Sequence, residues 1–244
     1  MRVLALLYGA VVYTLFFIAF LYLIPFVGGD MLSFLGMPIT VDAGGPAGGP
    51  AALINIGLLL LFGLQHSVMA RQTFKKAWTK VVPSSVERST YVLATTLVLY
   101  LIYTQWRPMP GIVWEVGPGI WHTLLIVLFF LGFGIVLLAT FLINHFELFG
   151  LMQVWCRFRG KEMPAPEFRM PMFYKMVRHP IYFGFVVAFW STPTMTVGHL
   201  LFAAIWTAYM VIAIGYEERD LIRQFGQTYI DYMAKVPSIL PFIR

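Results

Sequence analysis

Charged residues are scarce in this sequence. Only 11% of the 244 residues are Asp, Glu, Lys or Arg, whereas soluble domains carry about 25%. Hydrophobic residues make up 59% of the chain and aromatic residues 17%, and the mean hydropathy is +0.78. So much apolar surface could not face water, which excludes a soluble domain, a disordered or collagen-like chain, a coiled coil and a nucleic-acid-binding protein. The composition indicates a polytopic membrane protein.

Cysteine is almost absent as well. A single Cys, at position 156, rules out a disulfide framework and a zinc site built from cysteines. Nucleophilic catalysis through Cys156 is not expected, because its neighbours Trp155 and Arg157 offer no general base. No glycine-rich phosphate loop is present either. Gly132 and Gly134 lie inside an apolar run, and we expect them to serve helix packing.

Long apolar runs are what the sequence has instead. A membrane-spanning helix needs roughly 20 apolar residues, because it rises about 1.5 Å per residue across about 30 Å of hydrocarbon. Such runs occupy residues 3–27, 52–70, 89–106 and 120–143, and a shorter pair occupies about 180–194 and 198–216. The first run is longer than the apolar core of a signal peptide and is expected to be a retained anchor. Ser191-Thr192-Pro193-Thr194 interrupts the shorter pair, which favours a short helical hairpin over two straight spans.

The tail beyond Tyr216 has apolar residues at spacings of three and four, which is typical of an amphipathic helix. These residues are Leu221, Ile222, Phe225, Tyr229 and Met233. The predicted fold class is therefore all-α. We expect a polytopic membrane bundle of about six membrane helices, the last two forming a short hairpin, followed by a cytoplasmic amphipathic C-terminal helix.

Basic residues orient the predicted bundle. In a six-span arrangement with both termini on one side, sixteen of the 17 Lys and Arg fall on that side, and only Arg107 falls on the other. Because positive residues stay cytoplasmic when helices insert, both termini are expected in the cytoplasm. The expected location is a bacterial-type inner membrane, as a multi-pass protein in contact with lipid, without nucleic acid or an obligate protein partner.

Polar residues at membrane depth are costly, and each one is a candidate for a functional site. His66, His145 and His179 fall at cytoplasmic helix ends and are expected to contribute to a shared site. For any one of them alone, an interfacial histidine solvated by headgroups is the alternative. His122 and His199 fall at external helix ends, where interfacial solvation explains them. No pair of histidines has the i, i+3 or i, i+4 spacing of helical metal sites, so no metal is expected.

A pair of acidic residues strengthens this prediction. Glu217 and Glu218 stand where the last run ends, and neither has a basic residue three or four positions away. Adjacent helical positions differ by about 100° in direction, so one carboxylate can face the bundle while the other faces water. The inward carboxylate needs a partner, either Arg178 or a cationic ligand. Two solvated interface glutamates are the alternative.

The same residues form motifs that resemble those of membrane methyltransferases. Arg178-His179-Pro180-Ile181-Tyr182-Phe183-Gly184, with Glu217-Glu218 at the end of the next run, resembles the C-terminal signature of the isoprenylcysteine carboxyl methyltransferases and phospholipid methyltransferases. Three further segments narrow the resemblance to the methanethiol S-methyltransferases. They are Gln-His-Ser-Val-Met-Ala-Arg at 65–71, Asn-His-Phe-Glu-Leu-Phe-Gly at 144–150 and Met-Thr-Val-Gly-His-Leu at 195–200.

The resemblance implies that the chain binds S-adenosylmethionine (SAM), releases S-adenosylhomocysteine and uses no metal. It also implies one integral membrane methyltransferase domain over residues 1–244, with a four-helix membrane part at 1–143 and a cofactor-binding part at 144–244. The cofactor-binding residues that it implies are Arg178, His179, Pro180, Tyr182, Gly184, Glu217 and Glu218. The charges of these residues agree with this assignment. SAM carries a carboxylate, which needs a hydrogen-bond donor such as arginine, and cationic groups, which need a carboxylate. Gly184 leaves room for the close approach of a ligand.

The implied reaction is in-line transfer of a methyl group to methanethiol, which gives dimethyl sulfide at a cytoplasm-facing site within the membrane. Opposite charges disappear in this reaction, so a dry site with aromatic walls favours it. A free thiol has a pKa of about 8.5, so a general base assists at neutral pH. We expect His66 to be this base, with His145 and Glu147 as the alternative pair. The residues expected to contact the small volatile thiol are Gln65, Ser67 and Asn144.

The sequence is also compatible with other functions. The nearest alternative keeps the chemistry and takes an isoprenylcysteine carboxyl group or a phospholipid amine as the methyl acceptor. A small-molecule channel or transporter is a different class, which the clustering of polar residues at one face disfavours. A membrane scaffold without chemistry would bind no methyl donor.

Overall fold

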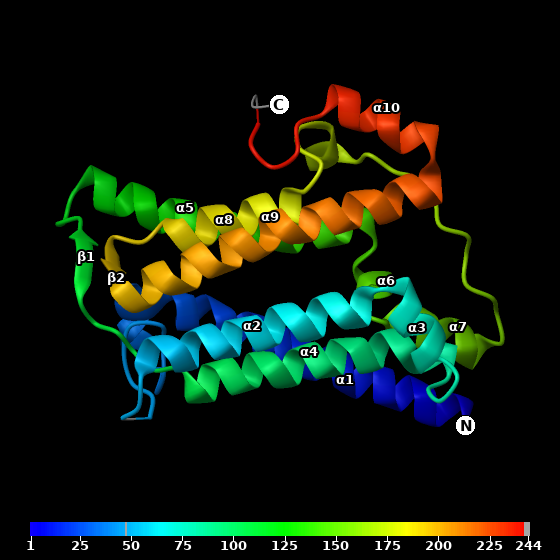
Figure 1. Cartoon of the computed structure of the whole chain (residues 1–244), viewed down its shortest axis with the longest axis horizontal. Helices are drawn as coiled ribbons and strands as arrows, with labels where there is room; N and C mark the ends of the chain where they lie inside the picture. The colour runs from blue at the N-terminus through cyan, green and yellow to red at the C-terminus, as the bar shows by residue number, and fades with distance from the viewer. Residues whose placement is uncertain (47, 242–244) are drawn as a thin grey trace. The chain divides into compact units, whose positions relative to one another are not determined.

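The computed structural model describes residues 1–46 and 48–241, and most of this part of the chain is helical (Figure 1). Its α-helices are α1 (Arg2–Gly28), α2 (Ala51–Ala70), α3 (Gln72–Trp78), α4 (Ser84–Gln105), α5 (Ile120–Ile143), α6 (His145–Leu148), α7 (Leu151–Arg159), α8 (Pro180–Trp190), α9 (Val197–Phe225) and α10 (Gln227–Lys235). The other elements are the 3-10 helices η1 (Gly29–Leu35) and η2 (Met172–Lys175) and the strands β1 (Ile112–Glu115) and β2 (Thr194–Thr196). The predicted all-α fold class is confirmed.

Each of the six apolar runs forms a helix, namely α1, α2, α4, α5, α8 and α9. By length and composition, four helical segments of the described residues could cross a membrane: Arg2–Leu35, Ala51–Ala70, Ile120–Ile143 and Val197–Phe225. With 11 residues α8 is shorter, and β2 follows it closely before α9 begins. The predicted hairpin is therefore present, although only its first helix is short.

The tail differs from its prediction at one point. The last apolar helix does not end near Tyr216, because α9 continues to Phe225 as one helix of 29 residues. Gly226 then ends the helix, with φ at +57° in the left-handed region that favours glycine. The separate amphipathic helix is therefore the shorter α10, whose Tyr229 and Tyr232 are buried.

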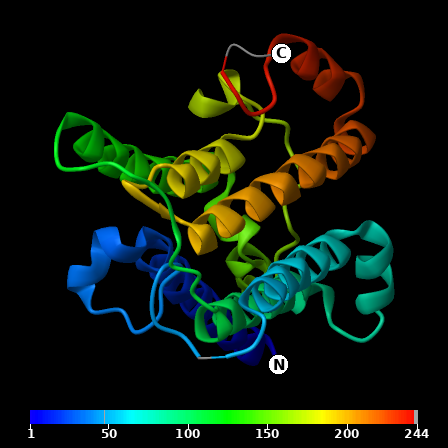
Figure 2. The same ribbon diagram turned by 60° about the vertical axis from the view of Figure 1, so that its left-hand side comes forward.

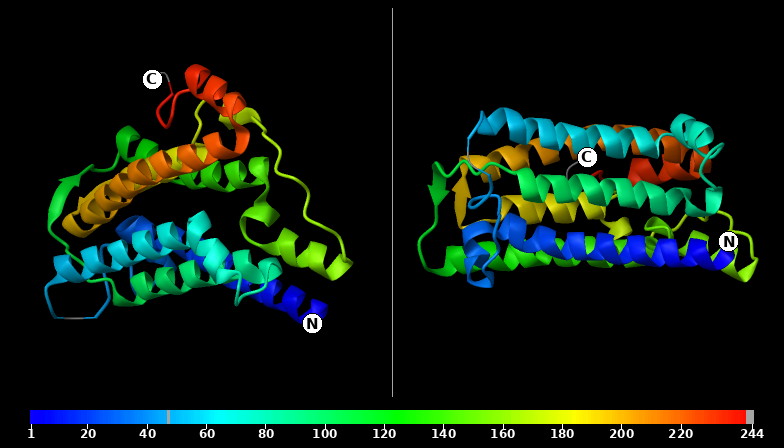
Figure 3. Two further views of the ribbon diagram at one scale, coloured as in Figure 1. Left: turned by 45° about the vertical axis from the view of Figure 1, so that its right-hand side comes forward. Right: turned by 90° about the horizontal axis from the view of Figure 1, so that it is seen from below.

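The contacts divide the chain into two compact units. Unit 1 comprises Met1–Gly111 and Asn144–Ala165. Within it α4 packs against both α1 and α2, as the two views of Figure 3 show, and α7 packs against α1. A side chain at Gly9 of α1 would collide with Val154 of α7, so glycine allows this close crossing.

Unit 2 comprises Ile112–Ile143 and Pro166–Arg244. Its α8 packs against α5 and forms an antiparallel pair with α9, which Figure 2 shows side by side. The strands β1 and β2 pair antiparallel, with Glu115 opposite Thr194. This ribbon was not predicted, because neither strand has more than four residues.

Two sequence-based expectations about unit 2 are wrong. His199 is not solvated at an interface: it is 0% exposed, and its Nε2 donates to the carbonyl oxygen of Phe189 at 3.0 Å. Its backbone N–H donates to the hydroxyl of Thr196, the N-cap of α9. Gly134 does not serve helix packing, because a side chain there would meet no atom within 4 Å, whereas Gly132 does contact α8.

Candidate functional site

The candidate site in unit 2 begins where α8 begins. Pro180 occupies the first turn of α8, where a missing N–H costs nothing and the fixed φ of proline suits a helix. His179 is the N-cap, so Arg178 and His179 precede the helix and Tyr182 lies in its first turn. The partner helix α9 presents two consecutive glutamates to these residues.

Each glutamate has its own set of partners. Glu218 Oε1 accepts hydrogen bonds from Arg178 Nε at 2.7 Å and from His179 Nε2 at 3.0 Å. Glu217 Oε2 accepts from the Tyr182 hydroxyl at 2.9 Å and lies 3.8 Å from His179 Nδ1. The Glu218 side chain is 13% exposed and the Glu217 side chain 46%. The predicted pairing of Arg178 with an inward carboxylate is confirmed for Glu218, while Glu217 keeps a half-exposed carboxylate.

Arg178 also holds the C-terminal segment in place. Its Nη1 donates to the carbonyl oxygens of Met233 and Val236, and its backbone N–H donates to the Pro237 carbonyl at 2.9 Å. The backbone N–H of His179 donates to the Ser238 carbonyl at 3.1 Å. Sequence reasoning missed these contacts because the acceptors are backbone carbonyls, which any residue supplies. Nε and Nη1 of Arg178 are therefore engaged within the protein, which is a structural role that was not predicted.

Tyrosines form a wall beside the glutamates, and sequence reasoning missed them too. Tyr232 donates to the carbonyl of Tyr174, and the ring of Phe168 packs against Tyr229 and Tyr232. Burial raises the pKa of Tyr232 to about 12. Burial, assisted by the negative charge of Glu218, raises the pKa of Tyr229 as well. These hydroxyls stay protonated at neutral pH, so the wall is uncharged and aromatic.

The structure gives Gly184 a packing role. A side chain at Gly184 would lie 2.7 Å from the Gly132 carbonyl oxygen, and one at Gly132 would lie 2.6 Å from the Gly184 carbonyl oxygen. The backbones of α5 and α8 touch at these two glycines. Close helix approach therefore explains glycine at position 184, whereas the sequence suggested room for a ligand.

In unit 1, His66 of α2 belongs to a network with α4. Its Nδ1 lies 3.3 Å from the Thr95 hydroxyl, which donates to the Tyr91 carbonyl and so accepts from Nδ1–H. Its Nε2 then accepts from the Tyr91 hydroxyl at 2.7 Å. The guanidinium of Arg88 lies 5.0 Å from the centroid of the Tyr91 ring, and the Phe62 ring stacks on His66. These contacts fit the tautomer of His66 that carries its hydrogen on Nδ1.

His145 belongs to a different network of unit 1. Its Nε2 lies 2.8 Å from the hydroxyl of Tyr13, and burial lowers its pKa. Next to it, Asn144 caps α6: its side-chain oxygen accepts from the backbone N–H of Glu147 at 3.4 Å. The Asn144 amide also donates to Glu147 Oε2 at 2.6 Å. Asn144 and Glu147 thus form a local cap, a role that their spacing of three residues could have indicated.

Gln65 and Ser67 lie on α2 on either side of His66. The amide nitrogen of Gln65 contacts the Met69 sulfur at 3.2 Å, and its Oε1 is buried without a hydrogen-bond partner among the described residues. The backbone carbonyl of Ser67 accepts from Arg71 Nε at 3.2 Å. An unmet buried acceptor costs free energy unless a ligand donates to it, so Gln65 is a candidate contact for a small polar group.

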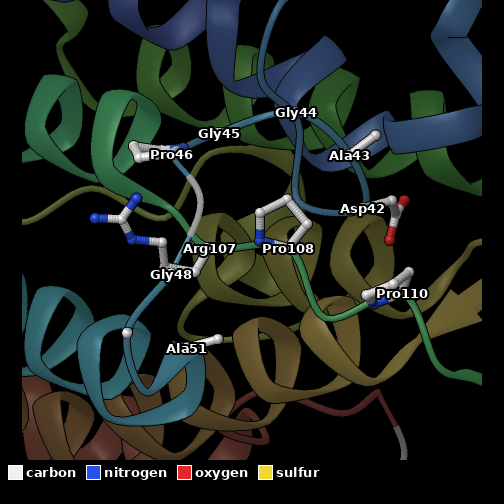
Figure 4. Close-up of a pocket in the computed structure, with 11 residues that line it drawn as sticks. Asp42, Ala43, Gly44, Gly45, Pro46, Gly48, Ala51, Arg107, Pro108 and Pro110 are labelled. Carbon is white, nitrogen blue, oxygen red and sulfur yellow. The ribbon is translucent and has the colours of Figure 1, made fainter.

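The predicted residues are divided between the two units. Unit 2 holds the predicted cofactor-binding set, which is Arg178, His179, Pro180, Tyr182, Gly184, Glu217 and Glu218. Unit 1 holds the predicted catalytic and substrate-binding set, which is Gln65, His66, Ser67, Asn144, His145 and Glu147. Among the described residues no three His, Cys, Asp or Glu are placed to hold a metal ion. A pocket of about 430 Å³ lies in unit 1 and is lined by none of the predicted residues (Figure 4).

Comparison with known proteins identifies close relatives. Over 242 residues the chain is 50% identical to the methanethiol S-methyltransferase of Mycobacterium tuberculosis, covering 99% of this chain and 97% of the relative. It is 48% identical over 241 residues to methanethiol S-methyltransferase 2 of Bradyrhizobium diazoefficiens, covering 98% and 91%. Nurim of Sus scrofa is 33% identical over 177 residues, covering 68% and 66%. No family model matches the chain, and no solved structure matches it.

Proposed function

Because the chain belongs to the methanethiol S-methyltransferase family, we propose that it transfers a methyl group from SAM to methanethiol and releases dimethyl sulfide and S-adenosylhomocysteine. The observation that carries the proposal is the cluster of Arg178, His179, Tyr182, Glu217 and Glu218. The proposal treats residues 1–244 as one methyltransferase domain. It places both termini in the cytoplasm and the site facing it, where SAM is made.

The surroundings of Glu217 fit a cationic ligand. When bound, SAM supplies a methyl group on a positively charged sulfonium. The half-exposed carboxylate of Glu217 attracts positive charge, and the uncharged rings of Tyr182 and Tyr229 offer cation–π contacts. We assign the direct contact to Glu217 and Tyr182 for this reason.

The other cofactor-binding residues act mainly by position. Glu218 joins Arg178 to His179, and Arg178 ties the C-terminal segment to the start of α8. Pro180 fixes where α8 begins, and Gly184 sets its contact with α5. In the proposal these five residues hold Tyr182 and Glu217 in place.

Activation of the thiol is assigned to unit 1. In the tautomer described above, Nε2 of His66 accepts from Tyr91, so the thiol proton reaches it most directly through that hydroxyl. Tyr91 takes the proton from sulfur and passes its own proton to Nε2, which leaves a thiolate and a protonated imidazole. His145 with Glu147 is the alternative base. Gln65, Ser67 and Asn144 stay in the proposal as contacts of the small thiol.

The test is turnover by purified full-length protein in lipid nanodiscs, supplied with SAM and methanethiol. We expect dimethyl sulfide in the headspace and an equal amount of S-adenosylhomocysteine in solution. Glu217→Gln should lower SAM affinity at least about tenfold, since a charge-assisted contact contributes about 1.5–3 kcal/mol. Glu167→Gln is the matched control, because Glu167 is exposed and pairs with Arg169 two residues away.

Two results would contradict the proposal, and they differ in meaning. If the protein binds no SAM in calorimetry, SAM is not its methyl donor. If it binds SAM but forms no dimethyl sulfide, methanethiol is not its acceptor, and an isoprenylcysteine carboxyl group or a phospholipid amine becomes the next substrate to test.

A further inference from the structure

The pocket of unit 1 is lined by none of the residues of the candidate site. It is lined by residues 42–46, 48, 49 and 51 and by residues 107, 108 and 110. Most of these residues are glycine, alanine or proline, so backbone and small side chains form most of its wall. The charged side chains among them are Arg107 and Asp42, which Figure 4 shows at opposite sides of the pocket.

Arg107 projects from a backbone that is tightly held. Asn55 of α2 is 0% exposed, and its amide nitrogen donates to the Arg107 carbonyl at 2.7 Å. Its Oδ1 accepts from the Arg107 backbone N–H at 2.9 Å. The neighbouring Trp106 donates from its indole nitrogen to the Val41 carbonyl at 3.0 Å. These bonds fix the segment that carries the guanidinium, so its position is part of the fold.

Two nitrogens of the guanidinium have no acceptor among the described residues. Nε and Nη1 of Arg107 are both buried, and neither has a hydrogen-bond partner among the described residues. A buried charged donor without an acceptor is costly. Asp42 supplies no acceptor to these two nitrogens, and its carboxylate lies close to Gly29, the first residue of η1. The unmet donors therefore point to an anion from outside the chain.

We propose that this pocket binds an oxyanion of the phosphate type through Arg107. The planar guanidinium donates parallel hydrogen bonds that match phosphate oxygens. The first residue of α2, Ala51, lines the same pocket, so the positive end of a 20-residue helix adds to the attraction. The anion is either the headgroup phosphate of a membrane lipid or free phosphate. This site is independent of the proposed methyl transfer, since none of the residues assigned to that reaction lines it.

The experiment measures the unfolding temperature of delipidated full-length protein in neutral detergent. One arm adds inorganic phosphate, a second adds phosphatidylglycerol, and a third adds diacylglycerol, which has no phosphate. We expect phosphate or phosphatidylglycerol to raise the unfolding temperature and diacylglycerol to leave it unchanged. A response to inorganic phosphate identifies a free anion, and a response to phosphatidylglycerol alone identifies a lipid headgroup.

Two variants make the result specific to Arg107. Arg107→Gln should abolish the increase, and native mass spectrometry should show at least about tenfold weaker binding of the same anion, because the variant loses its charge-assisted hydrogen bonds to it. The control Arg157→Gln removes the same charge from an exposed position of α7 and should keep the full increase. If Arg107→Gln folds poorly, Arg107→Lys keeps the charge without the planar fork and should bind more weakly. The proposal is overturned if the unmodified protein responds to neither anion, or if both Arg107 variants bind as well as it does.

Discussion

Glu217 and Glu218 are neighbours in sequence, yet their carboxylates have different surroundings. Glu218 neutralises Arg178 and accepts from His179, and all three side chains are at most 13% exposed. Glu217 is half-exposed and meets a tyrosine hydroxyl. The 100° turn between adjacent helical positions separates their roles.

We therefore predict that the two amide substitutions change stability by very different amounts. Glu218→Gln should lower the free energy of unfolding by about 3 kcal/mol, because it leaves a buried guanidinium without its counterion. Glu217→Gln should change it by less than about 0.5 kcal/mol, as exposed substitutions usually do. Denaturant titration of both variants measures this. Equal destabilisation by the two would show that Glu217 is also a structural partner.

His145 gives a prediction about acid stability. Burial lowers its pKa in the folded protein, so the unfolded chain binds a proton first as the pH falls. Stability is therefore lost from about pH 6.5, the ordinary pKa of histidine, down to the lowered pKa of the folded state. His145→Gln keeps a polar partner for Tyr13. Between pH 7.5 and 5.5, the unfolding temperature of this variant should fall less than that of the unmodified protein.

The control for this measurement is His122→Gln, near the start of α5. The unfolding temperature of this variant should fall on acidification by as much as that of the unmodified protein. If His145→Gln also behaves like the unmodified protein, His145 carries no part of the acid sensitivity.

At the scale of elements, the contact between α5 and α8 depends on glycine at one position of α5. A Cβ at Gly132 would lie 2.6 Å from the Ala188 backbone nitrogen and 2.6 Å from the Gly184 carbonyl oxygen. Backbone atoms of a packed helix cannot move aside as a flexible side chain can. Two residues further along, Gly134 has no atom within 4 Å of such a Cβ.

Gly132→Ala should therefore destabilise the protein by about 1–3 kcal/mol, the usual cost of overpacking. Gly134→Ala should leave stability unchanged or raise it by up to about 1 kcal/mol, because alanine favours a helix more than glycine does. Thermal unfolding of the two variants in one detergent tests both values. Equal stability of the two variants would mean that α5 and α8 separate easily.

At the scale of the whole molecule, the basic residues predict its orientation in the membrane. Lys161 follows α7 and should face the cytoplasm, whereas Gly117 lies between β1 and α5 and should face outward. Both positions are exposed. The chain has one cysteine, the buried Cys156, so a Cys156→Ser background allows single-site labelling.

In intact cells, a membrane-impermeant maleimide should label the Gly117→Cys variant and spare the Lys161→Cys variant. Both variants should label equally after the cells are permeabilised, which controls for accessibility. Labelling of only the Lys161→Cys variant in intact cells would reverse the orientation.

How much the sequence revealed depended on whether a feature is local. Apolar run length located the six helices, because hydrocarbon thickness sets the number of residues that a span needs. Proline at position 180 and the interruption after Trp190 located the hairpin, because both act on the backbone nearby. The end of α9 was missed, because Glu217, Glu218 and Arg219 look like the end of a span, yet the helix continues with polar residues to Phe225.

By itself the sequence determined the class of the protein, its apolar helices and the residue types of the candidate site, since composition, run length and motif spacing are properties of the chain. Only the tertiary structure decided which glutamate pairs with Arg178, that Gly184 meets Gly132, and that His199 is buried. It also showed that backbone carbonyls at residues 233–238 hold Arg178 and His179. These outcomes depend on which surfaces meet across tens of residues, and a carbonyl or a glycine looks the same in sequence whether or not something packs against it.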